Sequence, residues 1–146
     1  MALSVRDEPV AVFVLTETLR PDAARALRQC ADLGLHLTVL TGDRAAQAEQ
    51  LRENLLSSDF ANQASSTEPF CPIALTVESE LKPEEKVTRL FQLREQRGRV
   101  AMVGDGVNDA PALVASDAGI AMGCGADVSR ESAQVCLLTS ELDRIP

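Results

Sequence analysis

The residues Asp105 and Asp109 have the types and the spacing of a binding site. Asp105 follows the short apolar run 100–103, which is typical of a buried strand, and glycines on both sides of it permit a tight turn. Asp109 stands two residues before Pro111, in the predicted first turn of a helix. Open α/β sheets bind ligands at the carboxyl ends of their strands, so we expect both carboxylates to converge there.

Binding of a hard cation is the chemistry that suits these two acids. Mg²⁺ prefers oxygen ligands, usually one or two carboxylates together with waters and a phosphate oxygen. In the alternative interpretation Asp105 only caps a helix and Asp109 is solvated. The combination of glycines, acids and proline within 103–111 favours the metal site.

Composition excludes several classes of protein. The 146 residues are 45% hydrophobic, enough for one domain with its own core. A net charge of −8 and the absence of Trp and Tyr argue against a nucleic-acid-binding surface. No apolar stretch approaches the roughly 20 residues that cross a bilayer, and no signal peptide is evident, so we expect a soluble cytoplasmic chain. The four scattered cysteines predict thiols in a reducing compartment.

Alternating strands and helices are expected to position the acids. Apolar runs predict strands at 10–15, 35–40, 73–77, 100–103, 119–123 and 135–138. Helical spacing predicts helices at 21–33, 45–56, 83–98 and 109–115, with a turn of helix at 126–132. The pattern predicts an α/β, Rossmann-like parallel sheet of about five to six strands with helices on both faces. We expect a single domain over 1–146, with the polar segment 57–69 as an exposed loop or insertion.

Several segments match one family in the right order. Residues 104–111 match the pattern Gly-Asp-Gly-x-Asn-Asp-x-Pro, and further matches are Leu19-Arg20-Pro21, Thr41-Gly42-Asp43, Pro83-x-x-Lys86 and 118–123 followed by 126–128. Together they resemble the phosphorylation domain of P-type ATPases, cation pumps that form an aspartyl phosphate. That domain belongs to the haloacid dehalogenase superfamily. The ending 142–146 resembles the point where heavy-metal pumps enter their next membrane helix.

The resemblance implies roles in phosphate binding and catalysis. Thr41, in a loop with Gly42 and Asp43, would direct its hydroxyl and nearby backbone N–H groups at a phosphate oxygen, and Asp43 would cap the next helix and order the loop. Lys86 would bring positive charge to the transferred phosphoryl group. The alternatives are a simple turn into a helix at 41–43 and a solvated lysine at position 86.

The resemblance also implies a metal site. Asp105 would be the principal Mg²⁺ ligand and a catalytic residue, and Asp109 the second acid. Asn108 would donate a hydrogen bond to phosphate or position its neighbours. Mg²⁺ is the implied cofactor, whereas ATP would enter only through parts of a pump that this chain lacks.

The phosphate-accepting residue of the family is missing. Pumps carry a nucleophilic aspartate in the motif Asp-Lys-Thr-Gly-Thr, which does not occur here. Related phosphatases begin with a strand that ends Asp-x-Asp-Gly-Thr-Leu. Aligned with 12–19, that pattern puts Val14 at the nucleophile and Thr16 at the acid/base position. On either alignment the nucleophile is absent, so we expect the isolated chain to be inactive.

Three functions stay open. The first is part of the phosphorylation domain of a cation pump, of the heavy-metal type, at the cytoplasmic face of a membrane with the rest of the pump as its partner. There the chain would supply the Mg²⁺- and phosphate-binding half of the site. The second is a free-standing, inactive module that binds Mg²⁺, phosphate or a partner. The third is a small Mg²⁺-dependent phosphatase.

Overall fold

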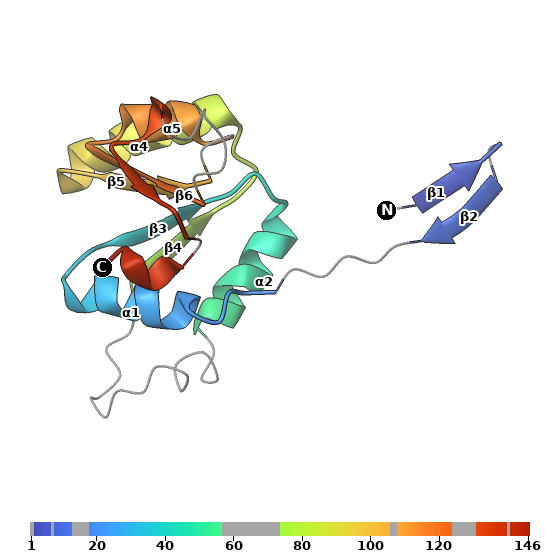
Figure 1. Cartoon of the computed structure of the whole chain (residues 1–146), viewed down its shortest axis with the longest axis horizontal. Helices are drawn as coiled ribbons and strands as arrows, with labels where there is room; N and C mark the ends of the chain where they lie inside the picture. The colour runs from blue at the N-terminus through green and yellow to red at the C-terminus, as the bar shows by residue number, and fades with distance from the viewer. Residues whose placement is uncertain are drawn as a thin grey trace.

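A computed structural model describes residues 2–6, 8–12, 18–56, 74–105, 108–123, 131–139 and 141–146 (Figure 1). In chain order the elements are β1 (Ala2–Val5), β2 (Glu8–Val12), α1 (Ala23–Asp32), β3 (Leu37–Leu40), α2 (Ala45–Leu56), β4 (Leu75–Glu78), α4 (Pro83–Arg97), β5 (Ala101–Gly104), α5 (Ala110–Ala115), β6 (Ala118–Met122), β7 (Val135–Leu137) and the 3₁₀ helix η1 (Leu142–Arg144). The predicted segments 57–69 and 126–130 lie outside the described residues.

Parallel strands joined by helices confirm the predicted α/β class. Strand β3 pairs in parallel with β4, in a register that sets Leu40 opposite Glu78. Strands β5, β6 and β7 form a second parallel sheet in that order. Among the described residues the five parallel strands are therefore divided into a pair and a triple, whereas the sequence predicted one continuous sheet.

The amino-terminal strand differs from its prediction. The apolar run at 10–15 predicted a buried parallel strand, but β2 pairs antiparallel with β1 and the Val10 side chain is 63% exposed. Arg6, with a φ of 50°, lies in the short turn that reverses the chain between these strands. The resulting hairpin stands apart from the other elements in Figure 1. An apolar run indicates a strand without indicating its partner, and residues 13–15 are not described.

Helices cover the parallel strands from two sides. In Figure 1, α4 and α5 lie on one side and α1 and α2 on the other. The core between α1 and α2 contains Ala23, Ala24 and Leu55, with Leu75 and Leu142 packed against them. A second core joins Leu113 of α5 to Ala121 of β6. Each sheet is thus stabilised by its own cluster of aliphatic side chains.

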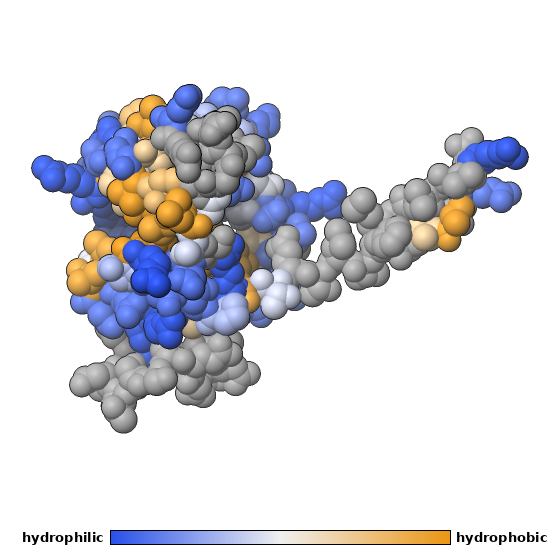
Figure 2. Space-filling view, viewed as in Figure 1, coloured by the Kyte–Doolittle hydropathy of each residue, from blue (hydrophilic) through white to orange (hydrophobic). Residues whose placement is uncertain are grey.

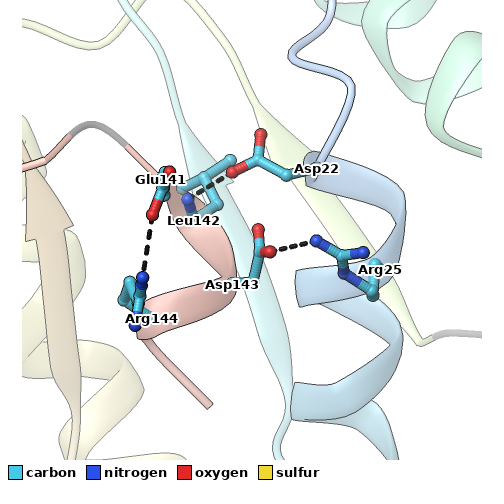
Figure 3. A network of polar contacts seen from close by, with 6 residues as sticks. All are labelled: Asp22, Arg25, Glu141, Leu142, Asp143 and Arg144. Carbon is cyan, nitrogen blue, oxygen red and sulfur yellow. Dashed lines mark hydrogen bonds and ion pairs between the residues drawn. The ribbon is translucent and has the colours of Figure 1, made fainter.

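The carboxyl-terminal turn η1 is fastened to the start of α1 (Figure 3). The Leu142 N–H donates to the Asp22 carboxylate at 2.5 Å, and Arg25 forms an ion pair with Asp143. Leu142 also packs against the α1–α2 core. Asp22 and Leu142, which are 120 positions apart in the sequence, therefore lie side by side. No local sequence signal predicted this contact.

Local signals explain where α4 begins and ends. Pro83 occupies its first turn together with two glutamates, and the Glu85 carboxylate accepts the Lys82 N–H at 2.7 Å. Gly98, with a φ of 93°, ends the helix. The predicted helices at 45–56 and 83–98 are confirmed to within one residue. The predicted helix at 21–33 begins later, at Ala23, and ends at Asp32.

Surface and cysteine features complete the description. Figure 2 shows hydrophobic surface in the region of β7, where Val135 and the following Leu138 are exposed. Cys30 is a buried free thiol, but Cys136 is disulfide-bonded, so the expectation of thiols throughout is wrong at Cys136. None of the helices in the described part of the chain is long and apolar enough to cross a membrane.

Candidate functional site

Backbone hydrogen bonds hold the loop 41–43 against the chain that leaves β4. The Thr41 N–H donates to the Glu78 carbonyl at 2.9 Å, and the Leu81 N–H donates to the Thr41 carbonyl at 3.0 Å. A third bond runs from the Glu80 N–H to the Asp43 carbonyl at 2.8 Å. Glu80 adopts a φ of 59°, which L-residues rarely occupy, to make this contact. The loop is therefore shaped by main-chain groups.

Side chains within the same loop lock its hydroxyl group. Thr41 Oγ1 donates to the Asp43 carboxylate at 2.5 Å and accepts the Asp43 N–H at 3.1 Å. The Asp43 carboxylate thus orients the Thr41 hydroxyl, and its role as the cap of α2 stays a prediction. Gly42, between them, is exposed.

Lys86 and Asp109 form the central contact of the candidate site. Lys86 lies in the first turns of α4, and its Nζ donates to Asp109 Oδ1 at 2.7 Å across 23 residues of sequence. The two side chains are only 14% and 17% exposed. Partial exclusion of water strengthens an ion pair of this kind relative to one at the surface.

The end of β5 and the start of α5 form an acidic junction that includes Asp105 and Asp109. Asp109 is the N-cap residue of α5, and a β-carbon at position 104 would lie 2.8 Å from Asp109 Cβ and 2.9 Å from its Oδ2. Glycine at 104 is what allows the Asp109 side chain to lie over the strand end. Asp105 directly follows β5, and both Asp105 and Asn108 are exposed.

The donor set at this junction fits Mg²⁺ in kind. Asp105 and Asp109 offer carboxylate oxygens, the ligands that this hard cation prefers. The described residues contain no group of three or more His, Cys, Asp or Glu side chains able to hold a metal together. Mg²⁺ commonly completes its coordination shell with water and phosphate oxygens.

The structure joins the predicted residues in two pairs. Thr41 contacts Asp43, and Lys86 contacts Asp109. The pairs are connected through Leu81, which binds Thr41 and stands just before α4. Asp105 and Asn108 lie at the same β5–α5 junction as Asp109. Their roles in binding metal and phosphate stay predictions.

Sequence reasoning missed an ion pair beside these residues. Arg89 Nε donates to both carboxylate oxygens of Glu78, at 2.8 and 2.7 Å. This hydrogen bond raises the pKa of the Arg89 guanidinium above its ordinary value. Glu78 directly follows the predicted strand 73–77 and Arg89 lies in the predicted helix 83–98. Their contact depends on how α4 packs against β4, and no sequence motif predicts that packing.

Comparison of the sequence with known proteins finds relatives along nearly the whole chain. The family model described as haloacid dehalogenase-like hydrolase matches residues 2–117. The copper-exporting P-type ATPase of Vibrio cholerae is 36% identical over 140 residues, which are 96% of this chain and 13% of that protein. The zinc-transporting ATPase of Bacillus subtilis is 36% identical over 139 residues, which are 95% of this chain and 19% of that protein. The chain thus spans less than a fifth of these curated relatives.

Solved structures show the same fold at substantial sequence identity. The catalytic domain of the CPx-ATPase CopB-B superposes with a TM-score of 0.72 at 30% identity, covering 97% of this chain and 50% of that one. A zinc-transporting PIB-type ATPase in its E2.Pi state superposes with a TM-score of 0.69 at 37% identity, covering 87% of this chain and 18% of that one. The chain therefore belongs to the haloacid dehalogenase-like hydrolase family, and it matches the catalytic part of heavy-metal P-type ATPases.

Proposed function

We propose that this chain supplies the Mg²⁺- and phosphate-binding half of an aspartyl-phosphate site in an ATP-driven heavy-metal cation pump. The observation that carries the proposal is the half-buried contact between Lys86 and Asp109. It brings a cation from α4 onto the acidic junction after β5, where phosphate and metal chemistry need charges of both signs. In such a pump the chain would lie at the cytoplasmic face of the membrane.

Each residue has a task in the proposed site. Thr41 presents a hydroxyl whose direction is set by Asp43. Lys86 balances negative charge that accumulates during phosphoryl transfer. Asp105 and Asp109 would hold Mg²⁺, with Asn108 beside them. The bound cation supplies charge neutralisation at the phosphoryl oxygens.

The phosphate-accepting aspartate comes from another segment of the pump. The candidate positions in this sequence are occupied by Val14 and Thr16, neither of which carries a carboxylate. Strands β3 and β5, whose ends lead to Thr41 and Asp105, are both edge strands of their sheets among the described residues. An edge strand presents backbone groups to which a further strand can bond. This arrangement supports a site completed by a segment outside the chain.

A titration followed by NMR tests the proposal. The isotope-labelled chain is titrated with inorganic phosphate in the presence and absence of Mg²⁺. We expect phosphate to shift the signals of Thr41 and Lys86 only when Mg²⁺ is present, and Asp105→Asn to abolish this response. Asp32→Asn, at the exposed end of α1, is the matched control and should respond like the wild type.

Two outcomes would contradict the half-site. One is phosphate binding that neither Mg²⁺ nor Asp105→Asn affects. The other is hydrolysis of an acyl phosphate by the purified chain that Asp105→Asn abolishes, because such turnover requires a complete site within this chain.

A further inference from the structure

We propose that the ion pair between Glu78 and Arg89 is a positioning device that sets Lys86 relative to the Thr41 loop. The inference rests on the function proposed above and deepens it by adding two residues that touch neither metal nor phosphate. It follows from the way Glu78 contacts two different elements at once.

Glu78 holds the loop through its backbone and the helix through its side chain. Its carbonyl accepts the Thr41 N–H at 2.9 Å. Its two carboxylate oxygens accept the Arg89 Nε–H at 2.8 and 2.7 Å. One residue at the end of β4 is therefore bonded both to the loop after β3 and to α4.

Arg89 transmits this restraint to Lys86 along α4. The two residues are three positions apart, so they project from neighbouring points on one side of the helix. A further bond from Arg89 Nη1 to Gln92 Oε1, at 3.1 Å, fixes the guanidinium from its other end. The Glu78 and Arg89 side chains are 23% and 25% exposed, which limits competition by water.

The pair sets the rotation of α4 while other contacts preserve its fold. The Lys82 N–H bond to Glu85 still begins the helix, and the Leu81 bond to Thr41 still anchors the chain before it. Loss of the pair is therefore expected to let α4 turn or slide slightly, rather than to unfold it. Lys86 would then spend less time against Asp109 and a bound phosphate.

The test compares Glu78→Gln, Arg89→Gln and the double variant in the intact chain. Glu78→Gln retains the backbone carbonyl that binds Thr41, so it removes only the ionic contact. We expect each single variant to weaken Mg²⁺-dependent binding of inorganic phosphate about tenfold, the scale on which partners of binding residues act. We expect the double variant to be no weaker than either single variant, because both remove one shared contact.

Two controls separate positioning from general stability. Glu49→Gln breaks the exposed ion pair between Glu49 and Arg52 on α2 and should leave phosphate binding unchanged. Arg89→Lys retains the charge and loses the Nε–H donor, so it should keep the fold and give intermediate affinity. Protection of the Lys86 ammonium from solvent exchange should fall in Glu78→Gln even without phosphate.

Failure of the proposed function and failure of the positioning role give different results. A wild-type chain that shows no Mg²⁺-dependent phosphate binding would overturn the proposed function, and this inference with it. Wild-type binding combined with Glu78→Gln and Arg89→Gln affinities within about twofold of it would overturn the positioning role alone. Losses that add in the double variant would do the same, because independent effects do not pass through one contact.

Discussion

The loop 41–43 and the described residues of the β5–α5 junction are held in different ways. Three backbone hydrogen bonds fasten the loop to the segment 78–81, and its threonine and aspartate bind each other. At the junction, the described contact that orients Asp109 is an ion pair from Lys86, which arrives from another helix. Asp105 and Asn108 remain exposed beside it.

Because of this difference, the two halves of the candidate site are expected to respond differently to side-chain substitutions. Backbone bonds survive most side-chain changes, so the loop 41–43, which is proposed to bind phosphate, is held in shape by its main-chain bonds to the segment that follows β4. The junction depends on charge, and Lys86 occupies the Oδ1 atom of an acid that is also proposed to bind Mg²⁺. In the proposed site, lysine and metal ion would therefore compete for Asp109 until phosphate offered the lysine another partner.

The largest effect is expected from Gly104→Ala, which disrupts the junction alone. The added β-carbon would lie within 2.9 Å of Asp109 atoms, so the carboxylate must move. We expect the free energy of unfolding to fall by about 2 kcal/mol, as in other overpacked sites, and Mg²⁺ binding to be lost. Chemical denaturation and a Mg²⁺ titration measure the two effects.

Gly119→Ala provides the matched control for that change. Gly119 lies in β6, and its β-carbon would lie 2.6 Å from the Leu113 carbonyl oxygen and would not touch the Asp109 side chain. We expect a similar loss of stability with Mg²⁺ affinity retained. Equal losses of affinity in both variants would show that the junction has no special requirement for Gly104.

Lys86→Met is expected to split the two binding reactions. Removing the half-buried ion pair should lower the free energy of unfolding by about 1–2 kcal/mol, between the values for exposed and buried pairs. Phosphate affinity should fall, but affinity for Mg²⁺ alone should rise because Asp109 loses its competitor. Calorimetric titration with each ligand checks the opposite signs. Lys82→Met, at the exposed lysine before α4, should change neither.

Thr41→Val tests whether the loop is preformed by its backbone. Loss of the hydroxyl bond to Asp43 should cost about 1 kcal/mol of stability, while phosphate affinity falls. Hydrogen exchange should show the Thr41-position and Leu81 amides still protected, because their bonds use main-chain atoms. Thr76→Val, at an exposed position of β4, is the control. Collapse of amide protection in the Thr41 variant would contradict the contrast drawn between the two halves.

The smallest effect is expected at Asp117, remote from both halves. The Val100 N–H that donates to its carboxylate, together with Arg94, holds the pKa of Asp117 below its ordinary value of 3.8. A lowered pKa in the folded state stabilises the fold above that value, and the contribution is lost as pH falls through it toward the lower folded pKa.

Asp117→Asn should therefore flatten the decline of unfolding free energy on the acid side and leave phosphate binding unchanged. Denaturation at several pH values measures this, with Asp32→Asn as control. An unchanged acid-side slope would show that the carboxylate makes no net contribution.

Local signals in the sequence were sufficient for individual elements. Proline with two glutamates at the start and glycine at the end predicted α4, and glycines beside acids predicted the turn after β5. These signals act within a few residues, so they can be recognised without knowing the fold. The α/β class follows from their alternation.

Partners were decided by the tertiary structure. The apolar residues of β2 suit a strand of either direction, so only pairing could reveal the antiparallel hairpin with β1. Division of the described parallel strands into a pair and a triple likewise depends on which strand edges meet. Backbone hydrogen bonds are the same for every residue type, so the side chains of one strand do not specify which strand it pairs with.

The candidate site divides along the same line. By itself the sequence supplied the proposed site residues, because threonine, lysine and aspartate are recognisable by type and by position at strand ends. Only the tertiary structure decided that Lys86 contacts Asp109 and that Glu78 joins the Thr41 loop to α4. Those contacts span distant parts of the chain and exist only once helix packing has set their distances and excluded water.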